Sequence, residues 1–494
     1  MSLATATREA PATPTTPPTA APTRRGPSLD TLFTAVFGLF GWAIGVERLT
    51  DNSFFWHLRA GQLILDRGFP RTDPFSFAAH GTPWVLQSWL AELGYAAINR
   101  EVGAFGIRLL IGLTGVAIAV LAFRLALRLS GDRVRAALLT AVALGSLETL
   151  WSERPLVFGV LALVVLLWVV EVPESRVGRR PVLALPILLW CWANVHGSFA
   201  LGFAYLGLHL LGRGLDGHPP WRGRERQLLT GTAIGAAACF VNPYGVGLVT
   251  FPVALLARSD ILRHVVEWQS PDFHSARSLP FAVWIVVFAA LLARAPGRTS
   301  RRDLLVSLPF LLLGLWALRN IALAPLVGLP IAARAVARPA GRRAVDRTAA
   351  VGWALAAVLV VVVAVFTARA AEQPSFAFDR YPVRALRTLQ RDGLLGKRLL
   401  ATDADAGYVI LRDWPRQQVF IDDRYDMYPR AVIDDYFTLA RARPGWAAVL
   451  ARRDIQVIVW PRGDPLVSLV EGSGHWRRLA QDPDRVVLVR DDVR

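Results

Sequence analysis

Two adjoining stretches of the sequence decide the fold. Residues 30–50 read DTLFTAVFGLFGWAIGVERLT, and residues 51–92 read DNSFFWHLRAGQLILDRGFPRTDPFSFAAHGTPWVLQSWLAE. The first stretch is an apolar run of membrane-spanning length, for which about 17–25 residues are needed, and the second is rich in charged and aromatic side chains. A membrane-length apolar run followed by a long polar connection is typical of a membrane protein.

The rest of the chain repeats this alternation. Of the 494 residues, 53% are hydrophobic and 19% are charged, and the mean hydropathy is +0.38; soluble domains carry about 25% charged residues. We therefore predict a polytopic α-helical membrane protein with about eleven transmembrane helices, ten to thirteen being allowed. A short apolar run at 246–257, broken by Pro and Gly, is interpreted as re-entrant. The predicted spans are 30–48, 104–126, 135–150, 156–172, 181–197, 199–212, 228–242, 279–293, 304–318, 320–337 and 349–368.

The basic residues indicate the orientation of these spans. The formal net charge of +17 comes almost wholly from arginine, since Lys397 is the only lysine. The arginines cluster in every second connection, which the positive-inside rule assigns to the cytoplasm. We therefore predict a disordered cytoplasmic tail over 1–27 and a C-terminus on the outer side. Charge spread over short connections argues against a nucleic-acid partner.

Two polar regions lie on the predicted outer side. The transmembrane module, 28–370, contains a long first outer loop at 49–103, in which residues 54–67 have the pattern of a helix lying along the membrane surface. Residues 371–494 are predicted to form a small α/β domain. Its predicted strands lie at 398–402, 419–422, 457–460 and 486–489, and its predicted helices lie near 382–394 and 430–452.

Polar and aromatic side chains gather on this predicted outer side. Ionisable groups near membrane depth are costly unless they face a cavity or a partner, so the pattern predicts a polar cavity that opens outward under the C-terminal domain. The residues assigned to this substrate cavity are His57, Trp84, Gln87, Glu92, Asn194, His196, Asp422, Arg424 and Tyr428.

Several motifs resemble those of the GT-C superfamily of integral-membrane glycosyltransferases. They are the string from Asp51 to Glu92 (D-x4-WHLRxGxxILxxGFPRTDPFS, then GxPWVxxxWLAE), "RP" at 154–155, "NVHG" at 194–197 and "IDDRYDMY" at 421–428. Within the superfamily, the chain is similar to bacterial proteins related to protein O-mannosyltransferases and lipid A aminoarabinose transferases. The resemblance covers most of residues 30–494 and implies a multi-pass protein of the bacterial plasma (inner) membrane.

The resemblance implies transfer of a sugar from a polyprenyl-phosphate-linked donor to a glycan, lipid or protein acceptor outside the membrane, with inversion. It makes Asp51 the expected catalytic base, since a carboxylate can take the proton of an attacking hydroxyl. The alternative is that Asp51 caps the surface helix. Asp73 is the second catalytic candidate, or else it opens the turn before Pro74.

Two arginines are expected to hold the donor phosphate. Arg154 and Arg319 lie at outer helix ends, and a guanidinium can bind phosphate oxygens in pairs. The alternatives are a local pair between Glu153 and Arg154, and extension of Arg319 to the membrane interface.

No cofactor is predicted. The spacing of Asp51 and Asp73 neither demands nor excludes a shared divalent cation, which stays an open alternative, and metal independence is the expectation. Two other functions compete with the transferase. One is a lipid-linked-sugar flippase or transporter, although the polar residues cluster on one face and do not track across the bilayer. The other is a non-catalytic scaffold.

Overall fold

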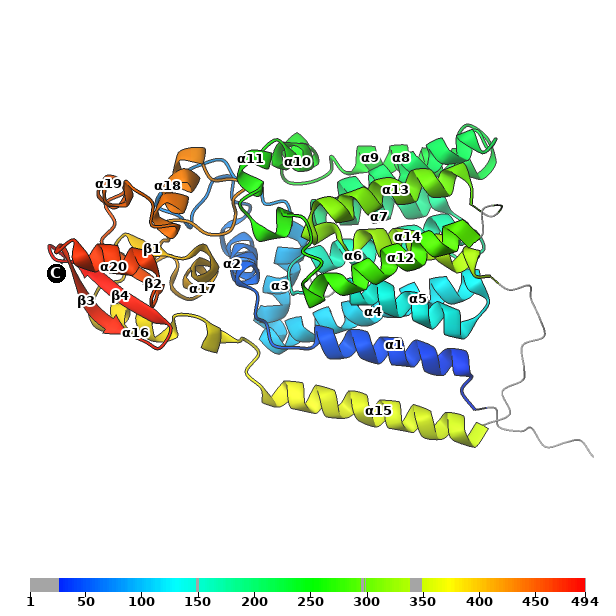
Figure 1. Ribbon diagram of the computed structural model, residues 1–494, viewed down its shortest axis with the longest axis horizontal. Coiled ribbons are helices and arrows are strands. Elements are labelled where there is room, and N and C mark those ends of the chain that lie inside the picture. The colour runs from blue at the N-terminus through cyan, green and yellow to red at the C-terminus, as the bar shows by residue number, and fades with distance from the viewer. Residues whose placement is uncertain (1–25, 148–150, 295–296, 298, 338–348, 494) are drawn as a thin grey trace, which may run out of the picture.

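The computed structural model describes residues 26–147, 151–294, 297, 299–337 and 349–493 (Figure 1). A helical bundle forms one end of the molecule, and the C-terminal segment, with a small β-sheet, forms the other. The tail predicted over 1–27 lies outside the described residues apart from Gly26 and Pro27.

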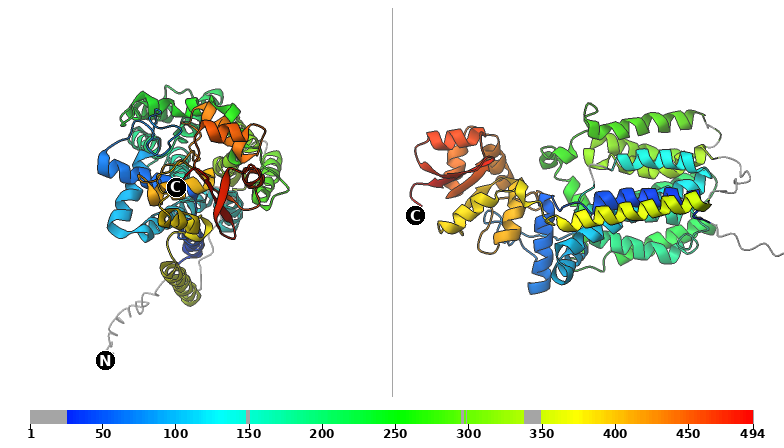
Figure 2. Two further views of the ribbon diagram at one scale, coloured as in Figure 1. Left: turned by 90° about the vertical axis from the view of Figure 1, so that its left-hand side faces the viewer. Right: turned by 90° about the horizontal axis from the view of Figure 1, so that it is seen from below.

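Helix α1 (Leu29–Gly45) packs along α4 (Ala104–Ser130) through facing glycines. A Cβ atom built on Gly41 would lie 2.2 Å from the carbonyl oxygen of Gly115, so only glycine permits this approach. Helix α15 (Ala349–Glu372) lies along α1 at the edge of the bundle and is largely exposed (Figure 2). The other helices of the bundle are α5 (Arg133–Gly145), α6 (Leu156–Glu171), α7 (Pro181–Val195), α8 (Phe199–Leu215), α9 (Gly223–Ala238), α12 (Leu279–Arg294), α13 (Arg301–Trp316) and α14 (Leu323–Ala335).

Three segments in the described part of the chain are helices both long and apolar enough to cross a membrane: Ala104–Ser130, Ala276–Arg294 and Val351–Glu372. Five further apolar helices have 10–17 residues, and one of them, α10 (Val246–Leu256), occupies the run interpreted as re-entrant. The count of eleven spans therefore stays a prediction. Most bundle helices have 13–17 residues, fewer than the about 20 residues of a usual span.

The first polar loop forms two helices at the end of the bundle that faces the sheet. Helix α2 (Asn52–Arg67) begins at its N-cap Asp51 and ends at Gly68, and α3 (Trp89–Val102) packs against it. Helix α2 crosses the bundle axis between the bundle and the C-terminal segment (Figures 1 and 2). A Cβ on Gly61 would lie 1.9 Å from the carbonyl oxygen of Glu92, so these two helices are in backbone contact.

The C-terminal segment contains a four-stranded sheet in the order β1-β2-β4-β3. The pair β1–β2 is parallel, and the pairs β2–β4 and β4–β3 are antiparallel. Helix α17 packs on α2, where a Cβ on Gly407 would lie 2.1 Å from the carbonyl oxygen of Asn52. The elements are α16 (Val383–Arg391), β1 (Leu399–Ala401), α17 (Asp403–Asp413), α18 (Arg430–Ala440), α19 (Trp446–Arg452), β2 (Val457–Pro461), α20 (Pro465–Gly472), β3 (Trp476–Gln481) and β4 (Arg485–Arg490).

Two details of this segment differ from the sequence prediction. The run at 419–422 is not a strand: Val419 forms only isolated bridges, to Ser76 of the first loop and to Leu399 of β1. The strand β3 was not predicted, because its side chains are partly or fully exposed and it carries two adjacent arginines. Val419 thus connects the first loop to the sheet.

Candidate active site

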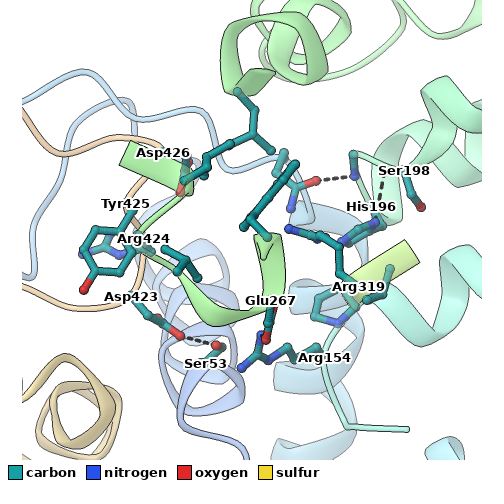
Figure 3. Close-up of a pocket in the computed structure, with 18 of the residues that line it drawn as sticks. Ser53, Arg154, His196, Ser198, Glu267, Arg319, Asp423, Arg424, Tyr425 and Asp426 are labelled. Atoms are coloured by element: carbon teal, nitrogen blue, oxygen red, sulfur yellow. Dashed lines mark hydrogen bonds and ion pairs between the residues drawn. The ribbon is translucent and has the colours of Figure 1, made fainter. Parts of the chain in front are cut away.

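A cavity of about 760 Å³ lies between the bundle and the C-terminal segment. Its lining residues come from the start of α2, the loop before α3, the connection before α6, the end of α7, the region from α10 to the short helix η2 (Val266–Trp268), and the loop 421–428 (Figure 3). Its lining is apolar along the bundle helices and polar toward the C-terminal segment. The apolar part includes Leu156, Val160, Leu201, Phe251, Leu255 and Leu313.

Asp51 is the N-cap of α2, as the capping alternative predicts, and it also forms an ion pair with Arg154. Its carboxylate accepts hydrogen bonds from the backbone N–H groups of Ser53 (2.8 Å) and Phe54 (3.4 Å). Both of its oxygens also accept from Nε of Arg154, at 2.8 and 2.7 Å. Asp51 is not among the residues that line the cavity, whereas Arg154 is. The carboxylate therefore orients the first turn of α2 and the guanidinium beside it.

Arg154 points its guanidinium between two carboxylates. Its Nη1 donates to Glu267 at 2.6 Å. Burial lowers the pKa of Arg154, but the charges of Asp51 and Glu267 outweigh burial and hold that pKa above its ordinary value. Nη2 is left without a hydrogen-bond partner among the described residues, so this fixed, permanently charged group still has one free donor edge. Glu153 does not pair with Arg154; it accepts from the backbone N–H groups of Thr50 and Asp51.

Arg319 lies near Arg154 and His196 in the same cavity (Figure 3). Its guanidinium lies 4.6 Å from the ring centre of Trp268. It has neither an ion pair nor a side-chain hydrogen bond with any described residue. Burial lowers the pKa of Arg319, as expected for a cation without a close counter-ion. Near this end of the bundle, the cavity therefore presents one guanidinium held by carboxylates, Arg154, beside one, Arg319, without a carboxylate partner in the part of the chain that the structure describes.

A buried pair lies deeper in the wall. Nδ1 of His57 and Oε1 of Glu92 are 2.6 Å apart. Burial raises the pKa of Glu92 well above its ordinary value and lowers that of His57 well below, so burial favours the neutral form of both groups. Both line the cavity, as their sequence prediction requires.

Four of the predicted site residues form one buried network that fastens the first loop to the C-terminal segment. Nη2 of Arg424 donates to Asp73 at 2.8 Å and to Asp422 at 2.6 Å. The hydroxyl of Tyr428 donates to Asp422 at 2.8 Å. Asp73 also accepts from the backbone of Phe75 and Ser76, and burial raises its pKa although Arg424 opposes the shift.

This network corrects the placement of two predicted cavity residues, because Asp422 and Tyr428 do not line the cavity and Arg424 does. Asp73, the second catalytic candidate, does not line it either. The turn interpretation of Asp73 fits its contacts. The three residues lie behind the cavity wall because their polar atoms satisfy Arg424 and local backbone.

Of the remaining predicted cavity residues, three line the cavity: Trp84, Gln87 and His196. The side-chain oxygen of Gln87 accepts from the backbone N–H of Gly197, and Nδ1 of His196 accepts from that of Ser198 at 3.0 Å.

Asn194 does not line the cavity. Its amide oxygen accepts from Nε1 of Trp89 at 2.7 Å, and its nitrogen donates to the carbonyl oxygen of Trp190 at 2.8 Å. Both ends of this buried amide are therefore used inside the fold, so its placement in the cavity is corrected as well.

Sequence reasoning missed Asp423, which does line the cavity. Its carboxylate accepts hydrogen bonds from the first turn of α2: from Asn52 at 2.9 Å, from the hydroxyl of Ser53, and from Nε1 of Trp56 at 2.7 Å. Burial raises the pKa of Asp423 to about 7, against the opposing charge of Arg154. The sequence does give one signal for Asp423, its position in the charged IDDRYDMY motif between Asp422 and Arg424, which are both predicted cavity residues.

In the described residues, no group of three or more His, Cys, Asp or Glu side chains is arranged to hold a metal ion. Metal independence stays a prediction.

Comparison with known proteins relates this architecture to solved transferase structures. No protein-family profile matches the chain, and no curated protein sequence does. ArnT from Cupriavidus metallidurans in the apo state aligns with a TM-score of 0.54 and 14% identity over 92% of this chain and 97% of that one. ArnT bound to undecaprenyl phosphate aligns with a TM-score of 0.50 and 14% identity over the same shares. The Archaeoglobus fulgidus oligosaccharyltransferase, in complex with Zn and sulfate, aligns with a TM-score of 0.49 and 11% identity over 87% of this chain and 68% of that one. The chain therefore shares the fold of ArnT, and the predicted GT-C resemblance is confirmed at the level of the fold.

Proposed function

We propose that this GT-C-like protein is a glycosyltransferase that moves a sugar from a polyprenyl-phosphate-linked donor to an acceptor at the outer face of a bacterial plasma membrane. The shared fold with ArnT, whose structure contains undecaprenyl phosphate, supports a lipid-phosphate donor. The acceptor belongs to the glycan, lipid or protein classes that bear hydroxyl groups. In this proposal the C-terminal segment lies outside the membrane and closes the cavity.

The observation that carries the proposal is the free guanidinium of Arg319 in a cavity with an apolar side. Arg319 is half-buried, and a cation partly withdrawn from water without a counter-ion is a favourable site for an anion. In the proposed complex, Arg319 and the free Nη2 of Arg154 contact the donor phosphate. The apolar lining along the bundle helices suits the first isoprene units of the same donor.

The proposed reaction needs leaving-group stabilisation and a base. As the bond between the anomeric carbon and the phosphate oxygen breaks, negative charge develops on the departing polyprenyl phosphate, and two preorganised guanidiniums stabilise it. Attack from the opposite face by the acceptor hydroxyl inverts the anomeric configuration. Asp51 serves in this scheme as a positioning residue, because its carboxylate fixes Arg154 through Nε.

A donor-consumption assay tests the proposal. Purified protein in lipid nanodiscs is incubated with a panel of polyprenyl-phosphate hexoses and pentoses, and released polyprenyl phosphate is measured for wild type, Arg319→Gln and Arg277→Gln. Arg277 is an exposed arginine outside the cavity and serves as the matched control. Loss of one charge-assisted contact, about 1.5–3 kcal/mol, predicts a roughly 10- to 150-fold loss of kcat/KM for Arg319→Gln.

The outcomes separate the competing functions. Consumption of one donor by wild type and by Arg277→Gln, with the expected loss in Arg319→Gln, supports the transferase. A wild-type protein that binds polyprenyl phosphate but consumes no donor in the panel contradicts the proposal and favours the flippase or the scaffold.

A further inference from the structure

We propose that Asp423 is the general base of this transferase, the group that takes the proton of the acceptor hydroxyl. The inference rests on the proposed function and adds a residue from the C-terminal segment to its chemistry. It begins from the position of Asp423, which lines the cavity beside the first turn of α2 (Figure 3). Among the charges around Asp423, that of Arg154 has the largest effect on its pKa, which it lowers by stabilising the carboxylate, so Asp423 lies near the proposed phosphate site.

The hydrogen bonds of Asp423 orient it without neutralising it. All three donors, from Asn52, Ser53 and Trp56, are neutral groups. The carboxylate of Asp51, in contrast, has both oxygens on a guanidinium nitrogen and lies outside the cavity lining. A carboxylate held by neutral donors keeps its basicity and a defined direction, whereas an ion-paired carboxylate is a weaker base.

Two other acidic residues of the cavity lining are committed to partners. Glu92 lies 2.6 Å from Nδ1 of His57, and burial raises its pKa well above the ordinary value, which favours its protonated form. Glu267 forms an ion pair with Arg154 at 2.6 Å. Neither can accept a proton without giving up an interaction that the fold already uses.

The remaining two acidic residues of the lining, Asp403 and Asp426, also belong to the C-terminal segment. Asp403 accepts hydrogen bonds from the hydroxyls of Tyr425 (2.8 Å) and Tyr436 (2.7 Å). The charges that act most strongly on Asp426 are those of Arg424, Asp422 and Arg258, whereas the charge that acts most strongly on Asp423 is that of Arg154. Asp423 is therefore the cavity carboxylate that combines neutral hydrogen bonding with proximity to Arg154.

The charged groups around Asp423 determine its titration. Burial raises its pKa to about 7, Asp422 and Asp51 add to the rise, and Arg154 and the Ser53 hydroxyl oppose it. A base whose pKa is near the working pH is ionised in a useful fraction of molecules and still binds a proton readily.

The proposed step is balanced. The acceptor O–H bond breaks and its proton passes to an oxygen of Asp423, while the freed oxygen electron pair forms the bond to the anomeric carbon. The bond from that carbon to the phosphate oxygen breaks, and its electron pair leaves with the polyprenyl phosphate held by Arg154 and Arg319. Asp423 then releases the proton to water.

The test is the pH dependence of kcat/KM for donor consumption in wild type, Asp423→Asn, Asp426→Asn and the exposed control Asp434→Asn. Wild type is expected to gain activity as the pH rises through about 7. For Asp423→Asn, kcat/KM is expected to fall by about 10²- to 10⁴-fold and no longer to rise with pH, whereas its binding of polyprenyl phosphate should equal that of wild type. Asp426→Asn keeps the rise, and Asp434→Asn matches wild type.

A second variant keeps the proposal falsifiable if Asp423→Asn does not fold. Trp56→Phe removes one hydrogen bond to the ionised carboxylate, so the rise in its pH profile moves to higher pH. Asp423→Asn activity within tenfold of wild type with the rise retained, or an unshifted profile in folded Trp56→Phe, overturns the assignment of the base. Failure of the proposed function itself is distinguishable, because wild type would then consume no donor at any pH.

Discussion

Replacing Arg424 with Met tests whether this residue holds the protein together or binds substrate. The guanidinium is 1% exposed, and the two carboxylates that it bridges, on Asp73 and Asp422, are both 0% exposed. These carboxylates lie 351 and 2 residues from Arg424 in the chain. The ring centre of Trp84 lies 4.5 Å from the same guanidinium. Methionine is close to arginine in volume, so Arg424→Met removes the charge and leaves only a small void in the interior.

The expected loss follows from the two carboxylates left behind. Removing one partner of a buried ion pair costs about 3–5 kcal/mol, because an uncompensated charge remains in a low-dielectric interior. With an unfolding entropy of about 2.1 cal/mol/K per residue, a chain of 494 residues loses about 1 °C per kcal/mol, so the melting temperature should fall by about 3–5 °C. Neutralising both acids as well, in the triple variant Asp73→Asn, Asp422→Asn, Arg424→Met, should recover at least half of the loss.

Intrinsic tryptophan fluorescence during heating measures this effect, with all variants scanned at one rate because unfolding of a large membrane protein is commonly irreversible. The exposed Arg380→Met is the control and should change stability by less than about 0.5 kcal/mol. A melting temperature of Arg424→Met near that of wild type, combined with a raised KM, would refute the structural role and assign Arg424 to substrate binding.

Three further predictions follow from contacts near α2. Asp51→Ala should be less stable than Asp51→Asn by about 1 kcal/mol, since both lose the ion pair with Arg154 but asparagine still caps the helix; equal melting temperatures would contradict the capping role. Glu153 has a pKa raised by burial to about 7, so the folded state binds a proton that the unfolded state releases between about pH 4.5 and 7. This group's contribution to stability is therefore present at low pH and lost as the pH rises through that window. The melting temperature of Glu153→Gln should fall less between pH 5 and 8 than that of wild type. An equal fall in both proteins would contradict the raised pKa of Glu153. Gly407→Ala should lose about 1–3 kcal/mol, because its Cβ would lie 2.1 Å from the carbonyl oxygen of Asn52; a variant as stable as wild type would show that α17 is not in tight contact with α2.

Much of the architecture followed from local properties of the sequence. The helix predicted at 54–67 is present as α2, and the strands predicted at 398–402, 457–460 and 486–489 correspond to β1, β2 and β4. Hydrophobic periodicity and length predict such elements because each residue of a helix or strand contributes its own buried apolar surface, so the pattern can be recognised within that one segment. The exposed β3 and the bridging Val419 escaped prediction, since their pairing depends on neighbours distant in the sequence.

For the site, the order of polar and apolar segments was enough to predict which regions of the chain meet. The first loop, the helix ends near Arg154 and Arg319, and the IDDRYDMY motif all contribute to one cavity. Which acidic side chain faces this cavity depends on the folded arrangement. Asp422 and Asp423 are adjacent, yet one turns inward to Arg424 and the other lies on the first turn of α2. The direction of a side chain on a loop depends on contacts with residues hundreds of positions away, and neither spacing nor composition contains those contacts.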